Sequence, residues 1–167
     1  LLAAIHAGSV DALQRLLHDN PGASTALIER PPHGPPPPLA YPLIAATSDY
    51  PGNPPHVGET IRRLIAAGAD VNAHCEGPHR ETALHWAASC DDLEAIDALL
   101  DAGADLEAPG AVVAGGTPLD DAVAFAQWRA ARRLVEHGAQ MAVWHAAALG
   151  RVDLLDRYFK SDAPEPK

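Results

Sequence analysis

The sequence of 167 residues has few cysteines and lacks the long apolar runs and the signal segments that mark disulfide-rich, membrane and secreted proteins. Two cysteines, Cys75 and Cys90, are too few for a framework of disulfides, and no apolar run approaches the length of a membrane-spanning helix. No basic stretch followed by an apolar run marks a secretory signal. We therefore expect a cytoplasmic protein with no membrane partner.

Basic and aromatic residues are also scarce. The formal net charge is -10, and proteins bind nucleic acid by neutralising phosphates with lysine and arginine, so we expect neither DNA nor RNA as a partner. Aromatic residues make up 5% of the chain, whereas 47% of it is hydrophobic and alanine is the commonest residue. Such a core must be built from small side chains at close spacing, which favours thin, closely stacked helices.

Internal repetition is the most informative feature of the chain. Gly68, Gly103 and Gly138 each begin a Gly-Ala pair, and they lie 35 residues apart. Other pairs of identical residues keep the same offset: Thr82 with Thr117, Leu84 with Leu119, Ala87 with Ala122, and Leu99 with Leu134. Each repeat is predicted to be two short amphipathic helices and a hairpin, and such units stack side by side.

These residues resemble the ankyrin repeat, which has a period of about 33 residues. Its pattern is a Thr-Pro-Leu-His start, two alanines, a Leu-Leu pair and Gly-Ala-Asp, and this chain has close matches at residues 82–88 and 99–105. The resemblance implies an all-α ankyrin repeat solenoid of about five helix-turn-helix repeats with short or irregular hairpin loops. It also gives Thr82 and His85 a structural role at the start of their helix.

The register of the repeats divides the chain into one ankyrin domain over residues 1–160, interrupted by a proline-rich loop and followed by a polar tail. The repeats are predicted at residues 1–21, 41–72, 81–107, 116–140 and 141–160, the loop at 22–40 and the tail at 161–167. The first repeat begins partway through and neither end has the polar face of a capping repeat, so we expect a fragment of a longer array. Ten arginines against two lysines favour a bacterial, GC-rich genome.

The repeats depart from one another at several positions. The second repeat has six extra residues, Tyr50 to Pro55, which predict a protruding loop between its two helices. In the fifth repeat Met141 is placed at the threonine position, which leaves no room for a hairpin after Gly138. In the fourth repeat Trp128 aligns with Leu93 and is predicted to lie in the core.

The resemblance implies a protein-protein interaction scaffold, whose partner the sequence does not identify. Such a scaffold binds through the concave face that the hairpins and first helices form. The candidate contact residues, taken by register, are His79, Arg80, Glu81, Ser89, Cys90 and Phe125. Alternatively, these side chains are simply exposed to solvent without a partner. We expect no cofactor. We expect a monomer, with end-to-end association as the alternative if the terminal caps are missing.

The six-residue insertion adds two further candidates, Tyr50 and Asn53. Loops on rigid scaffolds often carry function, so these side chains are candidates for contact with a partner. The alternative is structural, with the loop covering the groove between neighbouring helices.

A chemical function is the alternative to the scaffold. His74, Cys75 and His79 lie close together in the sequence; imidazole and thiolate bind zinc, and a cysteine with a histidine could act as nucleophile and base. However, the chain has no Cys-x-x-Cys pair, no recognisable oxyanion hole and no glycine-rich phosphate loop before a helix. We therefore predict that the protein is not an enzyme and has no metal site.

Overall fold

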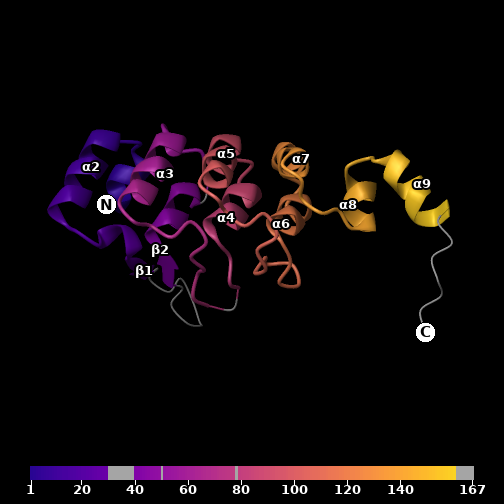
Figure 1. The fold of residues 1–167 in the computed structure, drawn as a ribbon, viewed down its shortest axis with the longest axis horizontal. Coiled ribbons are helices and arrows are strands. Elements are labelled where there is room, and N and C mark those ends of the chain that lie inside the picture. Colours follow the sequence, from indigo (N-terminus) through magenta and orange to yellow (C-terminus); the bar gives the residue numbers. More distant parts are fainter. Residues whose placement is uncertain (30–39, 50, 78, 161–167) are drawn as a thin grey trace.

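The computed structural model shows pairs of short helices stacked along one axis (Figure 1). The structure describes residues 1–29, 40–49, 51–77 and 79–160. The α-helices are α1 (Leu2–His6), α2 (Val10–Asp19), α3 (Val57–Ala66), α4 (Ala83–Ser89), α5 (Leu93–Asp101), α6 (Pro118–Ala124), α7 (Trp128–Glu136), α8 (Val143–Ala148) and α9 (Val152–Lys160). The predicted all-α repeat solenoid is confirmed.

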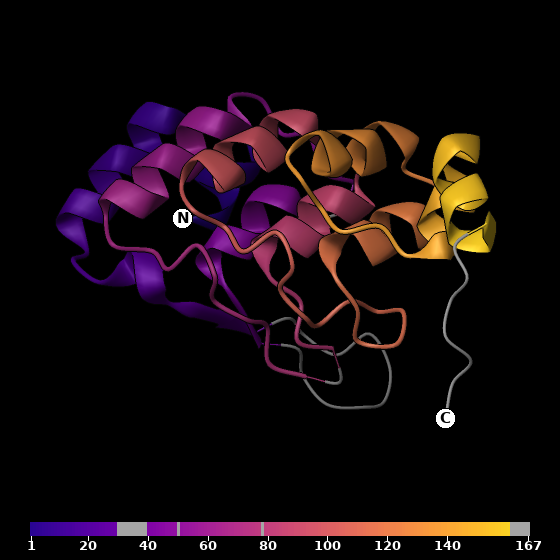
Figure 2. The ribbon, with the colours of Figure 1, turned by 45° about the vertical axis from the view of Figure 1, so that its right-hand side comes forward.

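The helices lie in two layers, and the hairpins project below them (Figure 2). The second helices of the repeats, α2, α3, α5 and α7, form one layer, and the first helices form the other (Figure 1). Helices this short are not stable alone in water, so each depends on burying its apolar side. The two layers share a core of fully buried leucine and isoleucine with small alanines between them: Leu13, Ile61, Leu64, Leu84, Ala87, Ala88, Ile96, Leu99, Leu119, Ala122, Ala131 and Leu134.

The first helix of the second repeat differs from the others. It is a 3-10 helix, η2 (Leu43–Ser48), and all of its residues are buried. It follows a strand, β2 (Ala40–Pro42), which pairs antiparallel with β1 (Leu27–Glu29); a short 3-10 turn, η1 (Ala23–Thr25), precedes β1.

The prediction of a loop over residues 22–40 is therefore wrong at both of its ends. Leu27, Ile28 and Tyr41 are residue types that suit a strand, and their pairing brings together positions on opposite sides of the proline run. The proline run itself, Pro35 to Pro38, lies outside the described residues. Each strand has only three residues, too few for a clear alternating pattern, and a proline-rich segment separates them in the sequence.

The six-residue insertion lies between η2 and α3, as predicted. The Asn53 backbone N–H donates to Asp92 Oδ2 at 2.8 Å, and Asn53 Nδ2 donates to the Cys90 carbonyl at 3.2 Å. Gly52 packs so closely on the next repeat that a Cβ there would lie 2.6 Å from Cys90 Cβ. This loop covers the α4–α5 turn, which favours the structural interpretation of Asn53. Tyr50 lies outside the described residues.

Two predictions about the C-terminal repeats are wrong. The N-cap of α8 is Ala142 rather than Met141, although α8 follows α7 without a hairpin as expected. Trp128 is 41% exposed, because α7 buries Ala130, Ala131 and Leu134 and its first residue projects from the edge of that side. Leu93, with which Trp128 aligns, is itself only half-buried. No helix in the described ranges combines the length and hydropathy needed to cross a membrane.

Candidate binding surface between two hairpins

Two hairpins that precede the third and fourth repeats form the candidate site. Hairpin 3 comprises residues 73–77 and 79–82, and hairpin 4 comprises residues 108–117. Both descend from the first-helix layer on the same side of the molecule (Figure 2). Within hairpin 3 the Cys75 N–H donates to the Glu81 carbonyl at 2.7 Å, and the Glu76 N–H donates to Ala40 of β2 at 2.6 Å. Hairpin 3 is therefore held from within and from the preceding strand.

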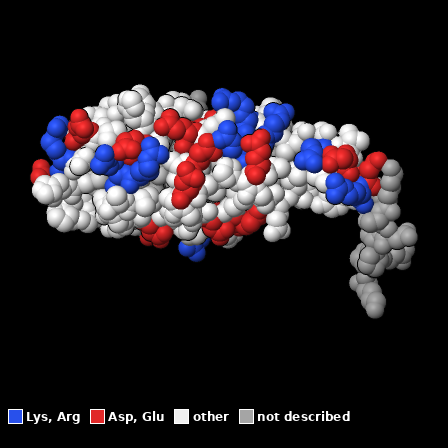
Figure 3. All heavy atoms as spheres, turned by 45° about the horizontal axis from the view of Figure 1, so that its top comes forward, with Lys and Arg blue, Asp and Glu red and all other residues white. Residues whose placement is uncertain are grey.

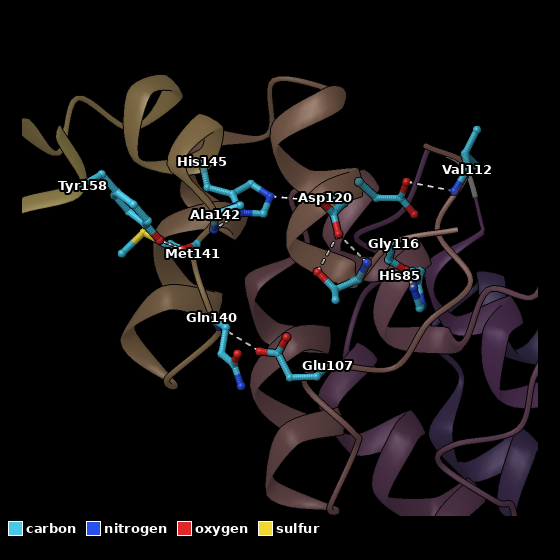
Figure 4. Close-up of polar contacts among 12 residues, drawn as sticks. His85, Glu107, Val112, Gly116, Asp120, Gln140, Met141, Ala142, His145 and Tyr158 are labelled. Atoms are coloured by element: carbon cyan, nitrogen blue, oxygen red, sulfur yellow. Dashed lines mark hydrogen bonds and ion pairs between the residues drawn. The ribbon is translucent and has the colours of Figure 1, made fainter. Parts of the chain in front are cut away.

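Backbone hydrogen bonds to a glycine carbonyl hold the two sides of hairpin 4 together. The N–H groups of Gly110 and Ala111 both donate to the Gly116 carbonyl, at 2.9 and 3.0 Å. It is fixed to the first-helix layer, because the Val112 N–H donates to Asp121 Oδ1 on α6 at 3.1 Å (Figure 4). The side chain of Val112 remains exposed beside this anchor.

The two hairpins touch at Gly110 and enclose a pocket beyond that contact. A Cβ at Gly110 would lie 2.1 Å from the Arg80 carbonyl oxygen, so the two backbones are in direct contact. The pocket has a volume of about 530 Å³, within the range of small-ligand sites. Its lining includes His74, His79 and Arg80 from hairpin 3 and Pro109, Ala111, Val112 and Ala114 from hairpin 4.

A buried histidine fixes the base of hairpin 3. His85 Nδ1 accepts hydrogen bonds from the Thr82 N–H at 3.1 Å and the Thr82 hydroxyl at 3.0 Å, so its hydrogen is on Nε2. Nε2 donates to the Gly116 carbonyl at 3.4 Å, which ties this helix start to hairpin 4 (Figure 4). Burial lowers the pKa of His85 to about 4, so the ring is neutral. The predicted structural role of His85 is confirmed.

An aspartate continues this network into the last repeat. Asp120 Oδ2 accepts from the Thr117 N–H at 2.5 Å and from the Thr117 hydroxyl at 2.9 Å. Its other oxygen, Oδ1, accepts from His145 Nε2 at 3.0 Å, and His145 Nδ1 accepts from the Ala142 N–H at 3.0 Å (Figure 4). These bonds fix the last repeat to the repeat from which hairpin 4 projects.

A buried acid lies directly beneath hairpin 4. Asp121 is fully buried, and its Oδ2 has no hydrogen-bond partner in the described part of the chain. Burial, assisted by the neighbouring charges of Glu81 and Asp120, raises the pKa of Asp121 to about 7, although the Val112 and Val113 N–H groups act in the opposite direction. Burial raises the pKa of Glu81 as well.

These raised pKa values predict that the protein loses stability as the pH rises. Between pH 4 and pH 7 the unfolded chain ionises Asp121 while the folded chain does not, so the free energy of unfolding falls. Asp121→Asn keeps an acceptor for the Val112 N–H but has no carboxyl group to ionise. Between pH 4 and pH 7 its free energy of unfolding is therefore expected to fall by about 2–4 kcal/mol less than that of the wild type. Urea denaturation at several pH values measures it, with Asp101→Asn on the exposed side of α5 as the control. Equal pH profiles for Asp121→Asn and the wild type would contradict the assignment.

The structure brings together only part of the predicted contact set. His79 and Arg80 line the pocket, whereas Glu81 is not one of its lining residues and its charge acts on Asp121. Ser89 and Cys90 end α4 and Phe125 follows α6, so these three lie at the opposite ends of the first helices from the hairpins. Cys90 is also covered by the insertion, whereas Phe125 is 46% exposed.

His74, Pro109 and Asp121 also belong to this region and are not among the contact residues predicted from the register. The adjacent acids Asp120 and Asp121, within an otherwise apolar first helix, were a usable signal for Asp121. The roles of His74 and Pro109 depend on how the two hairpins pack against each other, which no sequence pattern indicated.

The residues of the alternative chemical site do not form one. His74 Nδ1 donates to the Arg80 carbonyl at 2.5 Å, whereas Cys75, the next residue, is buried in the core. Within the described ranges no three His, Cys, Asp or Glu side chains are grouped so that they could hold a metal ion. The alternative function at His74, Cys75 and His79 therefore gains no support from the structure.

The stacked helix pairs and projecting hairpins define a helical repeat protein. The family model of ankyrin repeats, in three copies, matches residues 43–145. That match covers more than half of the chain, so the chain belongs to the ankyrin repeat family. No curated protein matches the sequence. Ankyrin repeats are generally protein-protein interaction modules and are typically not catalytic.

Proposed function

We propose that this chain is a non-catalytic scaffold that binds a protein partner on its concave face, through hairpins 3 and 4. The pocket between the two hairpins carries this proposal, because it presents Arg80 beside the exposed Val112 on a fixed backbone. Arginine and apolar anchors in pockets contribute much of the energy of protein interfaces. Hairpins that are already held in place lose little conformational entropy on binding, which strengthens the interaction.

The proposed surface extends along the first helices to Phe125. This side chain is 46% exposed at the far end of α6 and is a second apolar contact. We propose that the scaffold acts in the cytoplasm, where cysteines without a disulfide such as Cys75 and Cys90 are usual, and that it is a monomer. The net charge of -10 supports a protein partner rather than a nucleic acid.

Affinity capture from the source cell tests this proposal. The variant Arg80→Ala/Phe125→Ala is expected to lose at least one protein that the wild type captures. The control is Arg132→Ala, an exposed position on α7 in the second-helix layer, and it is expected to capture the same proteins as the wild type. Identical sets of captured proteins for all three forms would count against this surface.

A further inference from the structure

We propose that the pocket between hairpins 3 and 4 binds an acidic peptide segment, in which a glutamate or aspartate side chain is followed by an aliphatic one. This inference rests on the proposed function and specifies the chemistry of the partner. The acidic side chain binds the wall that hairpin 3 supplies, and the aliphatic side chain packs against hairpin 4.

The wall from hairpin 3 is basic. His74, His79 and Arg80 line it, and among the described residues no acidic side chain belongs to the pocket lining. The His74 ring is held by its Nδ1–H bond to the Arg80 carbonyl, so its orientation is fixed. Glu81 and Asp121 are not among the described residues that line the pocket; burial raises the pKa of both carboxyls, although the charge of His79 acts on Glu81 in the opposite direction.

Arg80 is available for a ligand, unlike most arginines of this chain. Figure 3 shows the basic side chains of the second-helix layer lying among acidic ones. Carboxylate partners are within salt-bridge distance of Arg62, Arg63, Arg129, Arg133, Arg151 and Arg157. Arg80 is exposed and has no such partner in the part of the chain that the structure describes. A guanidinium that pairs with a carboxylate in bidentate fashion is among the stronger polar contacts in proteins.

The wall from hairpin 4 is apolar. Pro109, Ala111, Val112 and Ala114 line it, and Val112 is 39% exposed. The contact of Gly110 with Arg80 and the bond from the Val112 N–H to Asp121 keep this wall at a fixed distance from the basic one. A ligand must therefore carry one negative and one apolar group, side by side.

These features favour a peptide over a polyanion. A nucleic acid needs many cationic contacts, whereas this pocket has one arginine and two histidines in a chain of net charge -10. The pocket, of about 530 Å³, is open to solvent between the hairpins. One carboxylate with one aliphatic neighbour fits both its charge and its size.

Chemical-shift perturbation of the ¹⁵N-labelled protein measures this binding. The probe is the capped peptide acetyl-Gly-Ser-Glu-Leu-Ser-Gly-amide, with Glu→Gln and Leu→Ser versions and an uncapped peptide ending in leucine. We expect the Glu-Leu probe to bind with a dissociation constant of about 0.1–1 mM and to shift the amides of residues 74–77, 79, 80 and 110–115. Arg80→Gln is expected to weaken it at least about fivefold, and the control Arg132→Gln to leave it unchanged.

Several results would overturn the inference: no shifts at the hairpins, equal affinity for the Gln probe, or binding of the uncapped peptide alone, which would indicate a chain terminus instead.

Selection from a random peptide library separates this failure from failure of the proposed function. Peptides that bind at the hairpins but lack the acidic-aliphatic pair refute the inference and leave the scaffold proposal standing. Selected peptides whose shifts all map to the second-helix layer refute both.

Discussion

Replacing Gly110 with alanine is expected to push hairpin 4 away from hairpin 3 and to lower the free energy of unfolding by about 3 kcal/mol or more. The added Cβ would lie 2.1 Å from the Arg80 carbonyl oxygen, 2.5 Å from its carbon and 3.1 Å from the Glu81 nitrogen. These are backbone atoms, so no rotation of a side chain relieves the overlap. In addition, Gly110 has a φ of +139°, a conformation that other residues rarely adopt.

Gly115→Ala is the matched control for this substitution. It lies on the same hairpin, with a φ of +68° and no atom within 4 Å of the added Cβ, so it tests backbone strain without overlap. Its expected cost is about 1 kcal/mol. Urea denaturation gives both values, and hydrogen exchange shows whether hairpin 4 opens. Equal destabilisation by the two substitutions would mean that the contact between the hairpins does not hold them together.

Replacing His145 with aspartate is expected to release α8 and α9 while the preceding repeats stay folded. His145 Nε2 donates to Asp120 Oδ1 at 3.0 Å, and α8 buries little besides His145 and Ala146 (Figure 4). An aspartate here places a second carboxylate close to Asp120 at a buried position, where like charges strongly destabilise each other. The local free energy of opening is expected to fall by about 2 kcal/mol or more.

Hydrogen exchange resolves this effect along the chain. Amides of α8 and α9 are expected to exchange faster in His145→Asp, whereas those of α4 to α7 keep the wild-type rates. His145→Asn is the matched control; it retains an acceptor for the Ala142 N–H without adding charge, so its effect is expected to be smaller. Unchanged exchange in α8 and α9 would show that contacts such as the Gln140 N–H to Glu107 Oε1 bond, at 2.8 Å, suffice to dock the last repeat.

The fold class could be predicted because its determinants recur within each repeat. The 35-residue offset, the Gly-Ala pairs and the small residues of the first helices identified stacked helix pairs, and His85 was correctly given a structural role. The errors fall where one repeat departs from the pattern. Trp128 is exposed because it begins its helix, and β1 pairs with β2 across a proline run that gave no periodic signal.

The sequence by itself determined the architecture of this protein: pairs of short helices stacked in one register, with a hairpin between most of the pairs. Only the tertiary structure decided what that register brings together. The backbone of Arg80 contacts Gly110, the Asn53 N–H donates to Asp92, and the Val112 N–H donates to Asp121. Each of these contacts joins different elements of the fold. The periodicity of the sequence indicates which side of each helix is buried. The pocket depends instead on how two hairpins from different repeats pack against each other, and the pattern within one repeat does not determine that packing.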